Sequence, residues 1–308
     1  MIEVEKLTKR FAGRTAVDEL SFSVGPGEVL GFLGPNGAGK STTMKMITGF
    51  LHPTSGTARI NGADIQQQPL AAKRQLGYLP EGAPGYGDMT VARFLDFIAE
   101  VRGLKGRQRR ERLEAVVADV HLESVLPQKI ETLSKGFRRR VGLAQAIIHD
   151  PKVLILDEPT DGLDPNQKHE VRNLIRGMAK DKIIVISTHI LEEVDAVCSR
   201  AMIIAHGRLL ADGTPTELAA RSRFHGALTL DVTPPEEAAA IVSALPEVAR
   251  VEPREDGRGL TVFPKDGAVL LPRLGKLIDE QQGTVQGLYQ ESGRLDEVFR
   301  SITGGAEA

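Results

Sequence analysis

A glycine-rich segment constrains the fold of this chain more than any other feature of its sequence. GPNGAGKST, residues 34–42, follows the apolar run VLGFL (29–33) and precedes a helical pattern that begins near Lys40. This strand, loop and helix context is the one that the G-x-x-x-x-G-K-[ST] phosphate loop requires. Its glycines let the backbone fold tightly, so that consecutive N–H groups can face the phosphates of a nucleotide. The sequence therefore predicts a nucleotide site on an α/β sheet.

The other residue types of this phosphate loop (34–42) support the same prediction. The helix N-terminus adds partial positive charge, Lys40 supplies a full charge, and the Ser41 hydroxyl can ligate Mg²⁺. We therefore expect a nucleotide and Mg²⁺ here. The residues expected at the nucleotide are Gly34, Pro35, Asn36, Gly37, Ala38, Gly39, Lys40, Ser41 and Thr42.

Apolar segments of strand length alternate with amphipathic helices up to about residue 220. VLIL (153–156), IIVIS (183–187) and AMIIA (201–205) are typical of buried parallel strands. NQKHEVRNLIRGMAK (166–180) has apolar residues at the i, i+3, i+4 and i+7 spacing of a helix. Such alternation predicts an α/β domain with a mainly parallel sheet.

Two further parts are expected in this first domain, which we assign to residues 1–222. Short alternating segments before the phosphate loop, such as IEVEKL and ELSFSV, predict a small antiparallel sheet. Residues 88–149 carry almost no strand signal, so we expect them to form a helical insert.

The pattern changes in the last third of the chain. From about residue 226 the order is strand, helix, strand, strand, helix and strand, followed by the closing helix RLDEVFRSI. This βαββαβ order predicts a small ferredoxin-like α+β domain over residues 223–308.

Charge and composition argue against several other classes of protein. The formal net charge of −2 gives no global basic field of the kind that a dedicated nucleic-acid binder has. The single cysteine, Cys198, excludes an intramolecular disulfide. The longest apolar runs are far short of the roughly 20 residues of a membrane helix. We therefore expect a cytoplasmic chain that reaches a membrane only through a partner.

One basic cluster, RGLKGRQRRER (102–112), leaves three interpretations open. It is a solvated helical face, a surface near anionic lipid headgroups, or a nucleic-acid contact. The scarcity of interleaved aromatic residues argues against the last of these, because bases are usually bound by stacking.

Two carboxylates and a histidine follow buried strands, at the end where ligands gather in open α/β sheets. In KVLILDEPT we expect Asp157 to support the metal and Glu158 to polarise an attacking water as general base. His189 directly follows the strand IIVIST and is expected to hydrogen-bond the γ-phosphate. Each of these residue types is more often structural when it stands alone. The phosphate loop on the same sheet favours a catalytic set of Glu158, His189 and Lys40.

Four motifs occur in one order: the phosphate loop, LSKGFRRR (133–140), LILDEPTDGLD (154–164) and STH (187–189). This order resembles that of the ATP-binding subunits of ABC transporters. The second motif, here called the signature segment, departs from the usual LSGGQ at Lys135 and Phe137. The resemblance implies a P-loop ATPase that binds ATP and Mg²⁺.

The resemblance also implies that each ATP site needs two chains. Ser134 and Gly136, which the signature segment retains, would contact the γ-phosphate bound to a second ATPase chain. Because this chain has a single phosphate loop, two chains would hold two ATPs head-to-tail between them, and we expect a homodimer. The helix N-terminus behind them would add anion binding. The segment 161–164 would link the two sites across the interface, with Asp164 among the residues at the nucleotide.

Two further positions carry over from the resemblance. Phe11, in LTKRF, matches an aromatic residue that stacks on adenine; the alternative is a core phenylalanine. Glu81, in GYLPEG, stands where the family usually has a glutamine that touches Mg²⁺ or water and senses the membrane subunit. The metal ligands implied by the resemblance are Ser41 and Asp157. Whether Glu81 also contacts the metal stays open, because a carboxylate at this position adds negative charge near the γ-phosphate.

The signature segment with the residues that follow it, and the closing LDEVFRSITGG, resemble the ATPases of ABC-2-type exporters, especially those of gliding-motility exporters. This implies an ATP hydrolase whose head-to-tail closure moves transmembrane permease subunits, at the inner face of the cell membrane and without nucleic acid. The alternative is a soluble ABC ATPase acting in translation or DNA repair. A P-loop kinase or GTPase would leave LSKGF, the acidic pair and the histidine unexplained.

Overall fold

The computed structural model describes residues 1–304 apart from 83–84, 233, 255, 266–267 and 281–284. The chain divides into two compact units, Met1–Thr214 and Pro215–Ala308. This boundary lies earlier than the expected one at residue 222. The reason is that the short helix α8 (Pro215–Ala219) packs against α11 (Leu295–Gly304), and both belong to the second unit.

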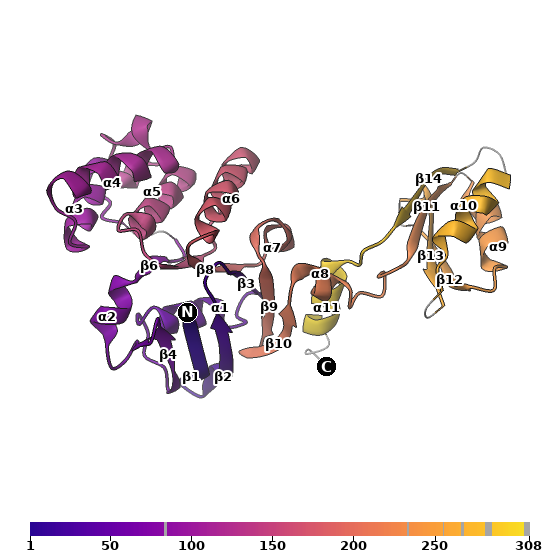
Figure 1. Cartoon of the computed structure of the whole chain (residues 1–308), viewed down its shortest axis with the longest axis horizontal. Helices are drawn as coiled ribbons and strands as arrows, with labels where there is room; N and C mark the ends of the chain where they lie inside the picture. Colours follow the sequence, from indigo (N-terminus) through magenta and orange to yellow (C-terminus); the bar gives the residue numbers. More distant parts are fainter. Residues whose placement is uncertain (83–84, 233, 255, 266–267, 281–284, 305–308) are drawn as a thin grey trace. The chain divides into compact units, whose positions relative to one another are not determined.

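A six-stranded sheet forms the centre of the first unit (Figure 1). Its strands, in spatial order, are β10 (Arg208–Gly213), β9 (Arg200–Ala205), β3 (Val29–Leu33), β8 (Ile183–Thr188), β7 (Val153–Asp157) and β6 (Leu76–Leu79). All neighbours pair in parallel except β10 with β9. The strands β3, β7 and β8 are buried along their whole length, which explains their unbroken apolar sequences.

The register of the parallel strands brings their carboxyl ends to one edge. Leu33 of β3 pairs with Thr188 of β8, and Asp157 of β7 pairs with Ser187 of β8. The residues that follow these three strands therefore meet at the same edge of the sheet.

A second, antiparallel sheet covers helix α1 (Lys40–Ile47). Its strands, in spatial order, are β2 (Arg14–Val24), β1 (Ile2–Phe11), β4 (Ser55–Ile60) and β5 (Ala63–Asp64). Met44, Met46 and Ile47 of α1 share one apolar core with residues of both sheets. This packing fixes the first turn of α1 at the carboxyl edge of β3.

The other helices of the first unit lie around the parallel sheet. They are α2 (Pro69–Arg74), α3 (Val91–Val101), α4 (Gly106–Asp119), α5 (Lys135–Ile147), α6 (Pro165–Ala179) and α7 (Leu191–Val197). Helices α3, α4 and α5 pack on one another and form the expected insert, and Figure 1 shows them gathered away from β1, β2 and β4. Two short 3-10 turns, Glu123–Val125 and Ile130–Thr132, connect α4 to α5.

Four arginines of the basic cluster at 102–112 have partners inside the first unit. The acceptors are the Lys73 carbonyl for Arg102, the Ile147 and Ile148 carbonyls for Arg112, Glu111 for Arg107, and Asp96 and Glu100 for Arg109. These contacts join the helices of the insert to one another and to α2. The contacts give these four arginines a structural role within the first unit, so the first interpretation, a solvated helical face, describes the cluster only in part.

The second unit contains a four-stranded antiparallel sheet with the spatial order β12, β13, β11, β14. The elements in chain order are β11 (Leu228–Val232), α9 (Pro235–Ser243), β12 (Val248–Pro253), β13 (Gly259–Pro264), α10 (Leu271–Glu280) and β14 (Val285–Gln290). This is the βαββαβ arrangement of a ferredoxin-like domain. Leu228, Leu230, Val262 and Leu274 belong to its apolar core. In the described parts of both units, no helix is long and apolar enough to span a membrane.

Candidate active site

The phosphate loop joins β3 to α1 through a tight turn. Gly37 and Gly39 have φ angles of 80° and 105°, in the left-handed region that glycine adopts without steric cost. A Cβ atom on Gly39 would lie 2.5 Å from the carbonyl oxygen of Ala16. No side chain fits at that point, because the backbone of β2 approaches too closely.

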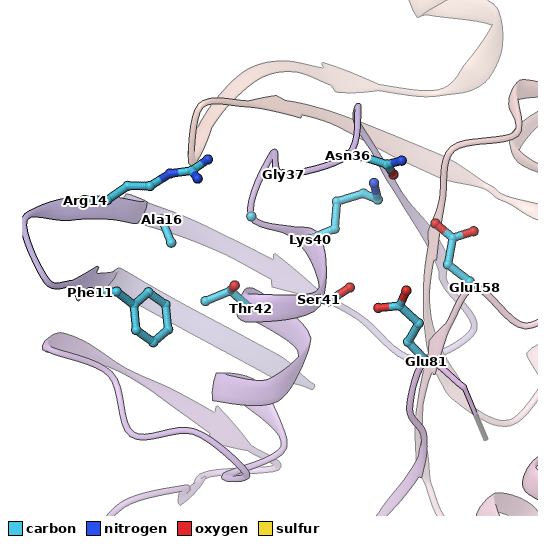
Figure 2. A pocket seen from close by; sticks show the side chains of 11 residues that line it. Phe11, Arg14, Ala16, Asn36, Gly37, Lys40, Ser41, Thr42, Glu81 and Glu158 are labelled. Atoms are coloured by element: carbon cyan, nitrogen blue, oxygen red, sulfur yellow. The ribbon is translucent and has the colours of Figure 1, made fainter. Parts of the chain in front are cut away.

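The turn forms part of a cavity of about 530 Å³ in the first unit. Its lining residues are Phe11, Arg14, Ala16, Asn36, Gly37, Gly39, Lys40, Ser41, Thr42, Glu81 and Glu158. Figure 2 shows Phe11 and Arg14 at one end, Glu81 and Glu158 at the other, and Lys40 between them. The cavity thus has a hydrophobic and basic end and an acidic end, separated by the phosphate loop.

Lys40 lines the middle of this cavity, and as a residue it is only 6% exposed. It donates hydrogen bonds to the carbonyls of Gly34 (2.7 Å) and Pro35 (3.2 Å). Burial lowers the pKa of Lys40, while the nearby Glu158, Asp157 and Glu81 oppose that shift. The three carboxylates favour the charged form, which is the form that attracts phosphate.

Ser41 and Asp157 meet beside Lys40. The Ser41 hydroxyl donates to Oδ1 of Asp157 at 3.2 Å, and the Ser187 hydroxyl donates to the same oxygen. Asp157 is completely buried, and its Oδ2 atom has no hydrogen-bond partner. A buried carboxylate oxygen without a partner is costly unless a cation or a water satisfies it. A hydroxyl and a carboxylate are also oxygen ligands that suit Mg²⁺.

Glu158 and His189 approach each other at the carboxyl edge of the sheet. His189 Nδ1 lies 2.9 Å from Oε2 of Glu158. Glu158 has a φ angle of 52°, and its N–H donates to the carbonyl and the hydroxyl oxygen of Ser187, both at 3.1 Å. A left-handed conformation costs a residue with a side chain about 1–3 kcal/mol and persists only where neighbouring contacts impose it. The structure therefore brings together two residues of the expected catalytic set in a strained turn.

Other expected site residues lie outside the cavity lining. The described residues that line the cavity do not include Ser134, Gly136, Asp164 or His189. Ser134 caps α5 by accepting a hydrogen bond from the Phe137 N–H at 3.3 Å, and Asp164 caps α6 through the Gln167 N–H at 2.9 Å. Four other expected residues do not line the cavity: Gly34, Pro35, Ala38 and Asp157. The first three form hydrogen bonds within the phosphate loop, and Asp157 accepts the hydrogen bond from Ser41.

The structure narrows the interpretation of Phe11. Its ring is 45% exposed and lines the cavity, so Phe11 is not a core residue, and the ammonium of Lys9 lies 5.2 Å from the ring centroid. Adenine stacking remains a prediction. Arg14, which the sequence interpretation missed, pairs with Phe11 across the β1–β2 hairpin. The Ala-Gly turn between the two strands was the available signal, because it indicates a hairpin that places these residues opposite each other.

Glu193 is a second residue that the sequence interpretation missed. It is buried on α7, where Thr188 donates to its Oε2 at 2.7 Å and Thr160 donates to its Oε1. Burial raises the pKa of this carboxyl. Glu193 thus ties the segment that follows Glu158 to the strand end that precedes His189.

The chain is similar to known ATP-binding proteins of transporters. A model of the family described as "ABC transporter" matches residues 17–161. The chain is 34% identical over 304 residues to the Nod factor export ATP-binding protein I of Paraburkholderia xenovorans (strain LB400), covering 98% of this chain and 97% of that protein. It is 39% identical over 223 residues to the probable multidrug ABC transporter ATP-binding protein YbhF of Escherichia coli (strain K12). That match covers 72% of this chain but only 38% of YbhF.

A solved structure supports the fold. The structure titled "Structure of ATP binding subunit of ABC transporter" superposes with a TM-score of 0.67 at 32% identity, over 72% of this chain and 92% of that chain. This likeness confirms the P-loop α/β architecture expected from the sequence.

Replacing Lys40 with alanine is expected to weaken nucleotide binding by about 10- to 100-fold. A hydrogen bond to a charged group contributes roughly 1.5–3 kcal/mol, and Lys40 is the buried cation at the phosphate loop. Titration with ATP by calorimetry would measure the change, with Lys45→Ala in the last turn of the same helix as the control. Equal affinities of the two variants would contradict this role for Lys40.

Replacing Glu193 with alanine is expected to lower the free energy of unfolding by about 1–3 kcal/mol, because two buried hydroxyl donors lose their acceptor. Glu192→Ala, on the exposed side of the same helix, should change it by less than about 0.5 kcal/mol. Denaturant unfolding of the two variants would compare them. A stability loss for Glu192→Ala as large as that for Glu193→Ala would count against the bridging role.

Proposed function

The chain belongs to the family of ABC transporter ATP-binding proteins, and we propose that it is the ATP-hydrolysing subunit of an exporter. The observation that carries this proposal is the position of Glu158. Its carboxylate lines the same cavity as Lys40 and Ser41 and lies within hydrogen-bonding distance of His189. A carboxylate in this position can act as a general base toward a water that attacks the γ-phosphate.

In the proposed hydrolysis, different residues of the chain bind the phosphates, accept the proton and contact the base. The N–H groups of the phosphate loop and the Lys40 ammonium bind the phosphates and offset the charge that develops on them. Glu158 would accept the proton of the attacking water, and His189, within hydrogen-bonding distance, would orient the Glu158 carboxylate. Contact of His189 with the γ-phosphate is part of the same proposal. Phe11 and Arg14 line the other end of the cavity and would contact the base and the sugar-phosphate part of ATP.

We infer that Mg²⁺ binds with ATP at Ser41 and Asp157. The unpartnered Oδ2 atom of Asp157 and the Ser41 hydroxyl supply oxygen ligands. In the described parts of the chain, no group of three or more His, Cys, Asp or Glu side chains is arranged to hold a metal. This suits Mg²⁺, which is commonly bound by one or two protein groups together with waters and substrate phosphates. The metal supplies charge neutralisation at the phosphates.

We infer further that a second copy of the chain completes the site. Ser134 caps the N-terminus of α5, a 13-residue helix, and is exposed. The residues described around the cavity do not include it. The N-terminus of such a helix favours a negatively charged group. A head-to-tail dimer would place Ser134 and Gly136 of each chain against the γ-phosphate bound by the other. Asp164 would then lie close to the interface.

The membrane partner is inferred from an exposed apolar surface formed by α3 and the segment just before it. Tyr86, Phe97 and Val101 are 57%, 40% and 65% exposed. Tyr86 makes edge contacts with Phe97 and with Phe94, at 5.9 and 6.2 Å between ring centroids. Side chains of this kind in one place are typical of a protein-binding surface. We assign it to a transmembrane permease subunit, which would hold the chain at the inner face of the membrane.

The exporter assignment rests on the relatives. The names of two of them refer to Nod factor export and to multidrug transport, and the first aligns along nearly the whole of this chain. These names do not favour the alternative of a soluble ATPase in translation or DNA repair. The ABC-2-type subgroup, suggested by the signature segment and the closing helix, stays a proposal.

Glu158→Gln is expected to bind ATP with affinity close to that of the unchanged chain and to hydrolyse it about 100- to 10,000-fold more slowly. The amide keeps the size of the side chain but cannot accept the proton. Single-turnover hydrolysis with labelled ATP would measure the rate. Glu192→Gln, an exposed carboxylate near His189, is the control and should keep the original rate. Turnover by Glu158→Gln at the original rate would refute the assignment of the base.

Charged residues on the apolar surface are expected to release the membrane partner. The double variant Phe97→Glu with Val101→Glu should no longer co-purify with a polytopic protein from detergent-solubilised membranes, since burying an unpaired charge is unfavourable. Its ATP affinity should be unchanged. Val269→Glu, which changes an exposed apolar residue of the second unit, is the control. Retention of the partner by the double variant would contradict the placement of the docking surface.

A further inference from the structure

One buried arginine contacts the catalytic turn from the helix that carries the signature segment. Arg139, in α5, is 5% exposed. Its guanidinium donates to the carbonyls of Pro80 (3.0 Å) and Pro159 (3.4 Å), and its Nη2 atom also donates to the carbonyls of Asp157 and Glu158. All four acceptors are backbone atoms, so this side chain fixes the path of the main chain.

These acceptors belong to two different segments. Pro80 immediately precedes Glu81, which lines one end of the cavity, and the other acceptors follow or end strand β7. The arginine itself lies five residues beyond the capping residue Ser134. A single guanidinium therefore joins the first turns of α5 to the backbone on both sides of the acidic end of the cavity.

Arg139 contacts the backbone at Glu158, the residue with the strained conformation. Glu158 has a left-handed φ angle of 52°, and such a conformation persists only when surrounding contacts determine it. Ser187 accepts the hydrogen bond from the Glu158 N–H, and Arg139 donates to the Glu158 carbonyl. The peptide groups on both sides of the Cα atom are thus held, and with them the direction of the carboxylate toward the cavity and His189.

We propose that Arg139 is a positioning residue, which holds the Glu158 carboxylate in its hydrolytic orientation and ties it to the signature segment of the same chain. This inference rests on the proposed function, because it assumes that Glu158 is the base. Arg139 contacts neither ATP nor water in this scheme. Movement of α5 toward or away from a partner's nucleotide would be transmitted to the turn at Glu158 and to the loop before Glu81.

The guanidinium group explains why arginine stands at this position. It presents five N–H donors in a rigid plane, which suits several carbonyl acceptors at once, whereas a lysine ammonium is a single point with three donors. The two neighbouring arginines do not share this role. Arg138 is exposed, and Arg140 donates to Glu170 and to the Val120 carbonyl.

Arg140 provides a matched control, because it is also buried on α5 and also loses a guanidinium when it is changed to glutamine. Steady-state ATP hydrolysis and ATP titration would be measured for Arg139→Gln and Arg140→Gln. We expect Arg139→Gln to lower kcat by about 100-fold, as a misplacement on the order of 1 Å does, with the Kd for ATP within about 3-fold. Arg140→Gln should keep kcat within about 3-fold. Equal kcat values for the two variants would overturn the proposal.

Arg139→Lys is the second variant, for the case in which Arg139→Gln does not fold. It keeps the buried charge but cannot span the same carbonyls, so we expect kcat to fall by about 10-fold or more with the Kd unchanged. A kcat equal to that of the unchanged chain would overturn the proposal. So would a loss that appears only in the Kd.

A double-mutant cycle with Glu158→Gln separates this inference from the proposed function. If Arg139 acts through Glu158, Arg139→Lys should lower the residual single-turnover rate of Glu158→Gln by less than about 2-fold. A full, multiplicative loss in that background would overturn the positioning role. Normal hydrolysis by Glu158→Gln alone would instead refute Glu158 as the base and with it the premise of the inference.

Discussion

The site depends on one geometric constraint, the alignment of three parallel strands. Because β8 pairs in parallel with β3 on one side and with β7 on the other, the residues after Leu33, Leu156 and Thr188 emerge at one edge of the sheet. That edge gathers the phosphate loop, the acidic pair and His189, which lie far apart in the sequence. Ligands of open α/β sheets bind at this edge for the same reason.

Electrostatic balance at that edge is the second requirement of the site. Two buried cations, Lys40 and Arg139, lie among the carboxylates of Glu81, Asp157 and Glu158. Burial lowers the pKa of both cations, and the carboxylates oppose the shift. The two cations therefore offset the negative charge of the three carboxylates. Of the two, Lys40 lines the cavity and can also contact a phosphate.

The sequence predicted those features that follow from local patterns. The phosphate loop, the strand ends at Asp157 and His189, and the βαββαβ order could all be located from motif spacing and periodicity. Glu193 and Arg139 could not, because each role depends on a partner that is distant in the sequence, Thr160 for Glu193 and Pro80 for Arg139. In the sequence Arg139 is one of three adjacent arginines, and only the packing of α5 against the sheet distinguishes it from Arg138 and Arg140. The domain boundary was placed too late because the packing of α8 on α11 leaves no local signal.

The most direct test of the central claim is a structure of the Glu158→Gln chain bound to ATP and Mg²⁺. The account predicts two chains in head-to-tail contact, with each ATP between the phosphate loop of one chain and Ser134 of the other. It also predicts that Ser41 and Asp157 lie at the metal. ATP bound to a single chain, with Ser134 left in solvent in a complex saturated with nucleotide, would contradict it.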